Sequence, residues 1–212
     1  MQYSGDGDQN SEESRDFEIG YRSQIGKRLS LDVATFGSLY RNLATLVAQD
    51  PFFVTVPVPQ MILPFGFDDV AHGYSYGGEI SAPWKVTDHW KLSPSYSMVH
   101  MKLDRESIAA GNTDTATPRN QIQIRSLLNL AKGFEWDSAI SYVSALRDAG
   151  FGAVPAYTRV DTRLGKRFGE SIEVSIVGQN LLAPRHFEFA DNEGIIHSPV
   201  ARSIFGKVTW HF

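Results

Sequence analysis

The last stretch of the chain, residues 200–212, alternates strictly between two sets of side chains. Every second residue from Val200 is mostly apolar, and this set ends on Trp210 and Phe212. A period of two is typical of a β-strand with one apolar face. Chain ends usually fray unless they are tied down, so a strand that runs to the final residue needs a neighbour. The chain is therefore expected to form a sheet that includes its own C-terminus.

The same two-residue period recurs along most of the sequence, and no convincing helical stripe accompanies it. Nine segments show it, at residues 17–21, 29–33, 74–86, 90–98, 122–130, 134–142, 160–164, 172–176 and 200–212. One face of each segment is apolar and the other carries Ser, Gln and charged residues. These segments predict an all-β protein with an antiparallel, up-and-down order of about nine strands.

The connections between these strands alternate between short and long. Short turns are predicted at 26–28, 87–89, 131–133 and 168–170, and long links at 41–73, 104–119, 147–154 and 183–199. Short turns at one end and long loops at the other are typical of a transmembrane β-barrel of the outer membrane, in which the short turns lie in the periplasm. A soluble sandwich or lipocalin-like binder has little reason to sort its loops in this way.

Tryptophan gives an independent indication. Trp84, Trp90, Trp136 and Trp210 all occur on the apolar phase of their strands, within a few residues of a short turn or of the chain end. Tryptophan favours the membrane interface, where the ring is in an apolar layer and the indole N–H can reach water. The four residues predict an aromatic girdle at the periplasmic interface. The alternative is that they pack one end of a soluble β-sandwich core.

Composition excludes several classes of function. The net charge is -4, with scattered Lys and Arg, so no nucleic-acid partner is expected. There are no cysteines, the six histidines have no metal-ligand spacing, and no nucleophile-elbow motif occurs. We therefore expect no metal site, no cofactor and no enzymatic activity. Pro83 and Pro94 lie within predicted strands and predict bulges near the short turns.

Several segments resemble the C-terminal part of the barrel of TonB-dependent outer-membrane receptors. They are "FEIGYRSQIGKRLSLDVATF" (17–36), "YGGEISAPWKVTDHWKLSPSYS" (76–97), "PAYTRVDTRLGKRFGESIEVSIVGQNLLAPRHFEF" (155–189) and "VARSIFGKVTWHF" (200–212). The resemblance implies a bacterial outer-membrane location, in contact with lipid, and active uptake of a scarce small molecule such as a siderophore, cobalamin or an oligosaccharide. It also implies that the barrel-assembly machinery reads the terminal strand with Phe212.

Members of this family look like barrels of about 22 strands that are closed by an N-terminal plug. The resemblance implies that residues 1–212 are the C-terminal part of such a barrel, with the plug and the TonB-contacting segment absent from this sequence. On this interpretation the chain is a receptor fragment that does not work alone, and it meets the plug and TonB only through the missing part. The alternative is a small complete outer-membrane barrel of eight to ten strands, structural or enzymatic.

The stretch at 51–69 is rich in aromatic residues and proline, and it falls on the side of the long loops. Phe52, Phe53, Phe65 and Phe67 are the candidates for contact with an apolar or aromatic ligand. The alternative, which we favour, is that this stretch extends the two flanking strands as a packed hairpin above the membrane.

The polar face of the strands is expected to line the barrel lumen. Its candidate residues are Glu79, Arg125, Arg159, Asp161, Arg163 and Glu173. The alternating charges at positions 159, 161 and 163 could steer an anionic ligand, or they could form a mutually neutralising wall that also contacts a plug. We favour the wall or plug contact.

Overall fold

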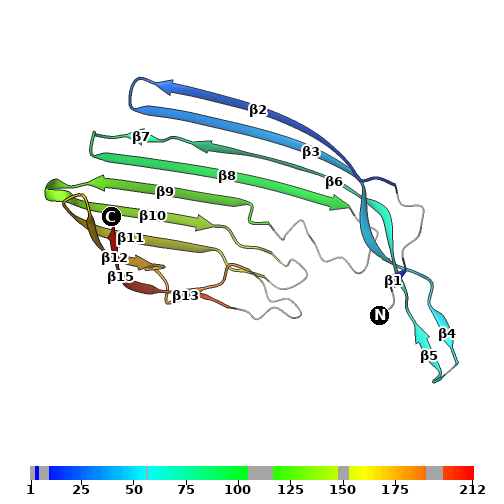
Figure 1. Ribbon diagram of the computed structural model, residues 1–212. Helices are drawn as coiled ribbons and strands as arrows, with labels where there is room; N and C mark the ends of the chain where they lie inside the picture. The colour runs from blue at the N-terminus through cyan, green and yellow to red at the C-terminus, as the bar shows by residue number, and fades with distance from the viewer. Residues whose placement is uncertain (1–2, 5–9, 56, 105–116, 148–152, 190–197) are drawn as a thin grey trace.

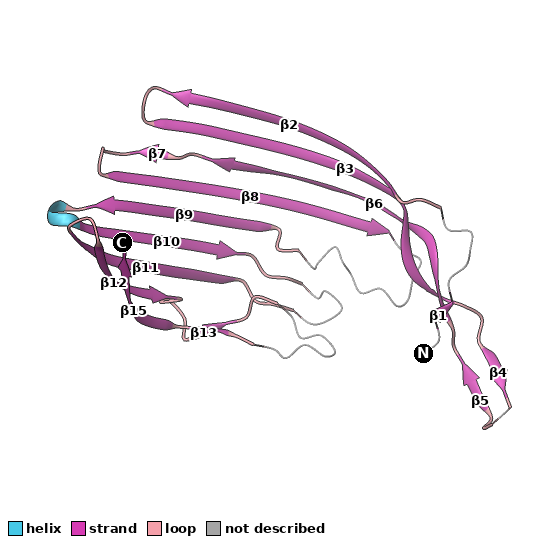
Figure 2. Ribbon diagram, in the orientation of Figure 1, coloured by secondary structure: helices cyan, strands magenta, loops and turns pink. Residues whose placement is uncertain are grey.

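The computed structural model describes residues 3–4, 10–55, 57–104, 117–147, 153–189 and 198–212 of the chain. They form a curved, single-layered sheet (Figures 1 and 2). The strands are β1 (Tyr3–Ser4), β2 (Glu13–Ile25), β3 (Leu29–Ala48), β4 (Phe52–Val54), β5 (Gln60–Ile62), β6 (Phe65–Ser81), β7 (Trp84–Lys85), β8 (Trp90–Asp104), β9 (Asn120–Asn129), β10 (Phe134–Val143), β11 (Tyr157–Phe168), β12 (Ile172–Gln179), β13 (Arg185–His186), β14 (Val200–Ala201) and β15 (Ser203–Trp210).

The main sheet is a meander in which each long strand pairs antiparallel with the next one along the chain. The order is β2, β3, β6 continued by β7, β8, β9, β10, β11, β12 and β15. All nine predicted strands are present in the predicted order, so the all-β, up-and-down prediction is confirmed. Within the described part of the chain, β2 and β15 each pair on one side only along the meander, and the sheet is open at these two edges.

The third strand is interrupted at Pro83, but the bulges predicted at Pro83 and Pro94 are absent. Pairing with β3 and β8 keeps one register across the break, and Pro94 pairs with Ile124 in an unshifted ladder. β6 ends at Ser81 and β7 begins at Trp84, and both segments pair with β3 and β8. At the break the Ala82 N–H donates to the carbonyl of Pro94 at 3.0 Å, and the Ser30 N–H donates to the carbonyl of Pro83 at 3.0 Å. Because the prolines contribute their carbonyls as acceptors here, these two bonds carry the ladder past the break without a bulge.

The short turns all lie at one end of the sheet, which we call the turn end, and the long connections lie at the other, the loop end (Figure 1). A short 3₁₀ element, η2 (Ala131–Gly133), forms the turn between β9 and β10. The fourth turn is at 169–171, one residue later than predicted. Phe168 still pairs with Ile172, and Gly169 takes the first turn position because its φ of 60° suits glycine.

The predicted link at 41–73 is wrong in its bounds, because strand pairing continues well beyond the regular alternation. Register shifts after Tyr40 and Leu43 absorb extra residues, with Asn42 at a φ of 55°, and pairing then resumes as far as Ala48 opposite Phe65. Only 49–64 connects β3 to β6, and it contains the β4–β5 hairpin. The predicted links at 104–119 and 147–154 lie largely outside the described residues, whereas 183–189 and 198–199 of the last link are described and include β13.

The two faces of the sheet differ sharply in chemistry. The apolar face consists of every second residue in nine ranges, counted from the first residue of each range. The ranges are 17–25, 29–39, 74–84, 90–98, 122–130, 134–142, 158–168, 172–178 and 204–210. Its large side chains are exposed, for example Ile204 at 69% and Val208 at 68%, whereas most fully buried side chains in the described residues are polar, such as Ser75 and Ser175. This is the reverse of a soluble globular protein.

The apolar face is a band that is about 7 to 11 residues tall, according to the ranges above. On β2, β8 and β10 it occupies 17–25, 90–98 and 134–142, nine residues in each case by the numbering. A tilted β-strand needs about 9–11 residues to cross the hydrocarbon layer of a membrane. In the part of the chain that the structure describes, no helix is sufficiently long and apolar to span a membrane.

Candidate ligand-facing site on the polar face

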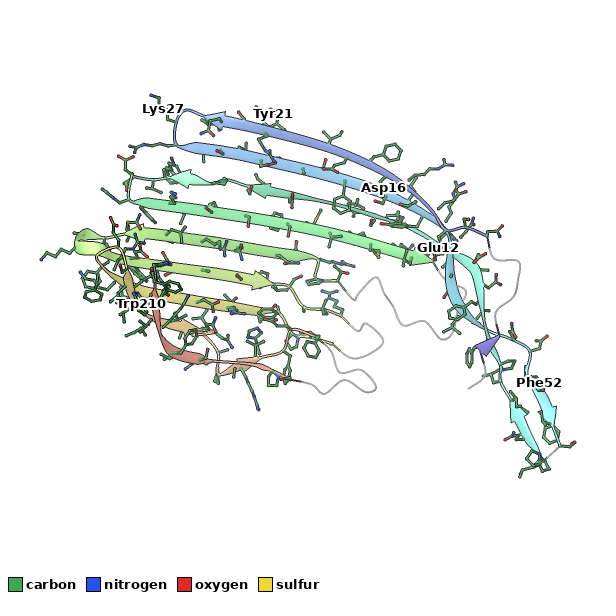
Figure 3. The ribbon with its side chains drawn as sticks, in the orientation of Figure 1. Glu12, Asp16, Tyr21, Lys27, Phe52 and Trp210 are labelled. Carbon is green, nitrogen blue, oxygen red and sulfur yellow. The ribbon has the colours of Figure 1, made fainter. Side chains whose placement is uncertain are left out.

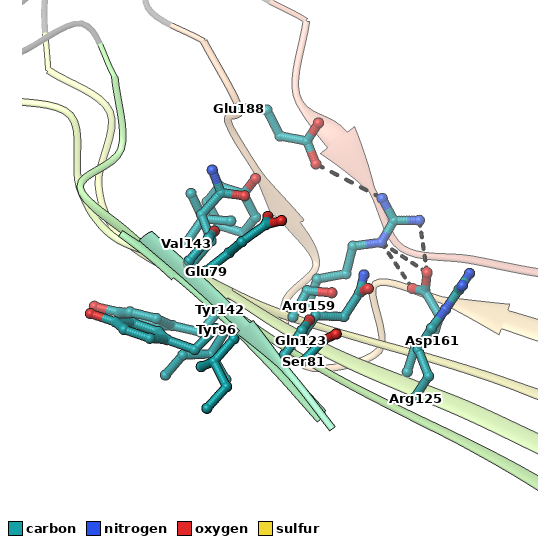
Figure 4. Close-up of a pocket in the computed structure, with 18 of the residues that line it drawn as sticks. Glu79, Ser81, Tyr96, Gln123, Arg125, Tyr142, Val143, Arg159, Asp161 and Glu188 are labelled. Carbon is teal, nitrogen blue, oxygen red and sulfur yellow. Dashed lines mark hydrogen bonds and ion pairs between the residues drawn. The ribbon is translucent and has the colours of Figure 1, made fainter. Parts of the chain in front are cut away.

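A recess of about 570 Å³ lies on the polar face over β6, β8, β9, β10 and β11. Figure 4 shows Glu79, Gln123 and Arg159 on this side, while Tyr96 and Tyr142 lie on the opposite side of the strands. The alternation of each strand explains this separation, because neighbouring residues point to opposite faces. The recess therefore belongs to the face that is predicted to line the lumen.

The floor of the recess is a row of neutral hydrogen-bonding side chains. Cross-strand pairs join Ser81 to Ser95, Ser95 to Gln123, Gln123 to Ser141, and Ser141 to Arg159. A second row, next to the first, joins Glu79 to Ser97 and Ser97 to Gln121. These hydroxyl and amide groups can both donate and accept hydrogen bonds, so this part of the wall suits a hydrated, uncharged surface.

Arg159 forms the wall of the recess at the loop end. Its Nε donates to both carboxylate oxygens of Asp161 at 3.0 Å, and its guanidinium lies 3.8 Å from Glu188 on the connection after β13. The Arg159 and Asp161 side chains are each 29% exposed. Figure 4 shows the two carboxylates on either side of the one guanidinium. The charge at 159 is thus held within the wall rather than pointed freely at a ligand.

Asn180 fixes the connection after β12 to this cluster. It is fully buried with a φ of 53°, its N–H donates to Asp161 Oδ1 at 2.9 Å, and its Nδ2 donates to the Val200 carbonyl at 2.9 Å. Asparagine tolerates the left-handed conformation better than most residues. Through its backbone N–H and its side chain together, Asn180 therefore joins β11 to β14 across the end of β12, and it explains the "GQNLL" segment as a strand terminator.

His186 on β13 packs against the same cluster. Its ring stacks on Tyr157 with centroids 4.2 Å apart, and its Nε2 lies 2.9 Å from Glu188 Oε1. The His186 side chain is 7% exposed. Together with Asn180, it anchors the start of the last long connection to β11.

A second cluster lies nearer the turn end, with Arg163 at its centre. Its guanidinium donates to Asp137 at 2.8 Å and Glu135 at 3.2 Å, and it also binds Glu173. Arg167 donates to Glu135 at 2.6 Å. Two guanidinium groups thus face three carboxylates. Gly165 leaves room for this arrangement, since a Cβ there would lie 2.5 Å from the Arg163 Nη2 atom.

The structure brings only part of the predicted polar set together. All six residues lie on the polar face, and Arg159 with Asp161 and Arg163 with Glu173 form contacts. Glu79 and Arg125 line the recess without an ion pair to any described residue within 4 Å. Within the described residues, no group of His, Asp and Glu side chains is arranged to hold a metal ion.

The four tryptophans lie on the apolar face at the turn end, and Figure 3 shows Trp210 on the last strand. Two of their indole N–H groups bond to neighbouring side chains rather than being left for water. Trp90 donates to Ser126 at 3.0 Å and Trp136 donates to Thr162 at 2.9 Å. These bonds explain how polar residues are accommodated on an apolar face. Phe212 lies beyond β15, fully exposed, with its ring 6.1 Å from Trp210.

The four predicted phenylalanines divide into two pairs. Phe65 and Phe67 belong to β6 and pair with Ala48 and Leu46 of β3. Phe52 and Phe53 lie on β4, in the hairpin that projects beyond the loop end, and they are 50% and 63% exposed (Figure 3). This is the strand extension that we favoured from the sequence. Phe52 and Phe53 are the most exposed of the four, while Phe67 is 41% exposed.

Comparison with known proteins agrees with this architecture. A family model described as "TonB dependent receptor-like, beta-barrel" matches residues 2–181. The chain belongs to this family.

Solved structures share the fold of this TonB-dependent receptor barrel. The ferric-catecholate import receptor Fiu from K12 E. coli has a TM-score of 0.72 at 17% identity, over 95% of this chain and 28% of its own. The siderophore receptor PirA from Acinetobacter baumannii has a TM-score of 0.72 at 12% identity, over 99% and 33%. The copper transporter OprC has a TM-score of 0.68 at 13% identity, over 97% and 32%. The chain thus spans about a third of the length of these proteins.

Sequence reasoning missed two features of the receptor barrel. The buried Asn180 is visible only as a left-handed residue after a strand, which the "GQNLL" pattern does not reveal alone. Lys166 was overlooked because the apolar alternation was followed only as far as Leu164. It continues through Lys166 to Phe168. The signal was available: a charged residue at an outward position of an otherwise apolar series.

Proposed function

We propose that this chain is the C-terminal part of the barrel wall of an outer-membrane receptor that imports a scarce small molecule with energy from TonB. One observation carries the proposal: a nine-strand meander of the family's fold has an exposed apolar band on one face and a charged, hydroxyl-rich lining on the other. Such a sheet satisfies its backbone internally except at its two open edges, which the rest of the barrel would pair, and it can face lipid on one side and water on the other.

The membrane location is best tested with the tryptophans, since all four of the protein lie at the turn end of the apolar face. The 212-residue chain is folded into vesicles of phosphatidylcholine brominated at shallow or deep acyl positions. We expect strong quenching of tryptophan fluorescence by the shallow bromines and weak quenching by bromines at the bilayer centre. Equal fluorescence in brominated and plain vesicles would show that the apolar face does not contact lipid.

The polar face is proposed to contact the plug of the complete receptor. The cluster around Arg159 and the cluster around Arg163 each contain one more carboxylate than they contain guanidinium groups. Their surplus charge favours a cationic or hydrogen-bond-donating partner, and it argues against steering of an anionic ligand by Arg159 or Arg163. Cross-linking from a cysteine at Gln123 to the plug of the full receptor tests this contact.

The imported molecule is proposed to be a siderophore, cobalamin or an oligosaccharide, first met by the loop end. The exposed Phe52 and Phe53 are suited to an apolar or aromatic part of that molecule. Deleting the gene in its own bacterium should abolish uptake of one of these three classes and leave the other two unchanged. Replacing both phenylalanines with alanine should then weaken binding of that class about tenfold, with Phe65→Ala as the control in the hairpin stem.

The terminal strand is proposed to be read by the barrel-assembly machinery. Strand pairing runs to the end of the chain, since the His211 N–H donates to the Ser171 carbonyl at 2.8 Å. Deleting Phe212 should therefore lower the amount of protein inserted by that machinery, while spontaneous folding into detergent micelles should be unchanged.

A further inference from the structure

Lys166 is the one charged residue on the apolar face as defined above, within the described residues. A lysine at the centre of a lipid-facing surface costs about 2–4 kcal/mol, and near the interface about 0–1 kcal/mol. Lys166 lies two residues before the end of β11, at the turn end. Its position is thus the part of the band where a positive charge is tolerated and where phospholipid headgroups begin.

Aromatic rings hold the Lys166 ammonium in place. Its Nζ lies 4.2 Å from the centre of the Phe134 ring and 5.8 Å from that of Phe168. The Nζ also donates to the backbone carbonyl of Lys132 in the η2 turn. These contacts direct the side chain away from the middle of the apolar band and toward the turn, as expected for a lysine whose stem lies on apolar surface.

The ammonium retains hydrogen-bonding capacity. It has three N–H groups, and no carboxylate of a described residue lies within 4 Å of it. Glu135 and Glu173 belong to the polar face and bind Arg163 there. The turn that accepts its one hydrogen bond contributes a second cation, Lys132. A positive charge with no carboxylate partner among the described residues, next to a turn that contains a second lysine, therefore marks this point of the interface.

We infer that Lys166 forms a binding site for the phosphate of an anionic phospholipid headgroup in the leaflet at the turn end. The lysine N–H groups donate to the phosphate oxygens, and the acyl chains lie along the apolar face beside Phe134 and Phe168. The attraction of one lysine near an anionic surface corresponds to about a fivefold preference in binding. This inference rests on the proposed membrane location.

Native mass spectrometry tests the site with the full 212-residue chain in maltoside micelles that contain either phosphatidylglycerol or phosphatidylcholine. The variants are Lys166→Gln, Lys166→Arg and the control Lys207→Gln. Lys166 pairs with Val174, and Val174 pairs with Val208, so these three residues form one cross-strand row. Lys207 is the neighbour of Val208 in the sequence, and Lys207 points to the polar face. The control thus removes the same charge at the same height from the opposite side of the sheet.

We expect the unmodified chain and Lys207→Gln to retain phosphatidylglycerol about fivefold better than phosphatidylcholine. Lys166→Gln should lose this preference and Lys166→Arg should keep it. Equal preference in Lys166→Gln, or an equal loss in Lys207→Gln, would overturn the site while leaving the membrane location intact. A chain that keeps its strand content by circular dichroism and retains neither lipid would overturn the membrane location as well.

Discussion

Residues that are neighbours in the sequence lie on faces of opposite chemistry in this sheet. Ile140 on the apolar face is 46% exposed, and Ser141 on the polar face lines the recess. Val208 and Lys207 stand in the same relation on β15. On the apolar face, Ser126, Ser138 and Thr162 are bonded to one another or to tryptophan. The polar face holds the two clusters of charges around Arg159 and Arg163. Because a single-layered sheet has no interior to fill, the difference lies between its two faces, as the proposed contact with lipid on one side and water on the other requires.

The strongest test of this contrast places one charge on each face. Ile140→Lys should lower the free energy of unfolding from phospholipid vesicles by about 3 kcal/mol, because the lysine would enter the middle of the lipid-facing band. Ser141→Lys, one residue away, should change it by less than 1 kcal/mol, since the recess is polar. Urea titrations of the two variants, followed by tryptophan fluorescence, provide the measurement. Similar losses in both would mean that the two faces do not meet different solvents.

Within the polar face, the contrast is between a clustered and an unclustered arginine. Arg163→Met should cost about 2 kcal/mol, because it leaves Glu135, Asp137 and Glu173 close together without their shared partner. Arg125→Met, on the same face but without a carboxylate partner among the described residues, should cost less than 0.5 kcal/mol. The same urea titration compares them. An equal cost would show that the Arg163 contacts contribute nothing beyond loss of a side chain.

The anchor at Asn180 should be weaker than the Arg163 cluster. Asn180→Ala loses the bond to the Val200 carbonyl and places a Cβ in a left-handed conformation, which together should cost about 1–2 kcal/mol. Asn180→Gly removes the same bond but suits the backbone, so it should recover part of the loss. Hydrogen exchange of the β14 amides should increase in both variants. Unchanged exchange in both would contradict the anchor.

The sequence was sufficient to predict the strands and the face on which each residue lies. It was insufficient to predict the contacts between residues that are distant in the sequence. The alternation through Ile140 and Tyr142 predicts the face of each residue, because lipid and water impose a pattern with period two on every strand. The length of β3 was not predictable, because register shifts near Asn42 hide the continued pairing with β6. The partners of Arg163 and Asn180 were also not predictable, since they depend on the register between strands and on rotamers.

The smallest expected effect, at Gly165, sharpens the comparison between the two clusters of the polar face. Gly165→Ala should displace the Arg163 guanidinium and cost about 1 kcal/mol or less, because the new Cβ meets the flexible end of a side chain. In an Arg163→Met background the same substitution should be nearly neutral. The double-mutant cycle measures this coupling directly. Full additivity would show that Gly165 is not required for the arginine to reach Glu173. A coupling close to the whole cost of Gly165→Ala would show that a missing side chain is what allows one guanidinium to bridge three strands, from Asp137 on β10 across β11 to Glu173 on β12.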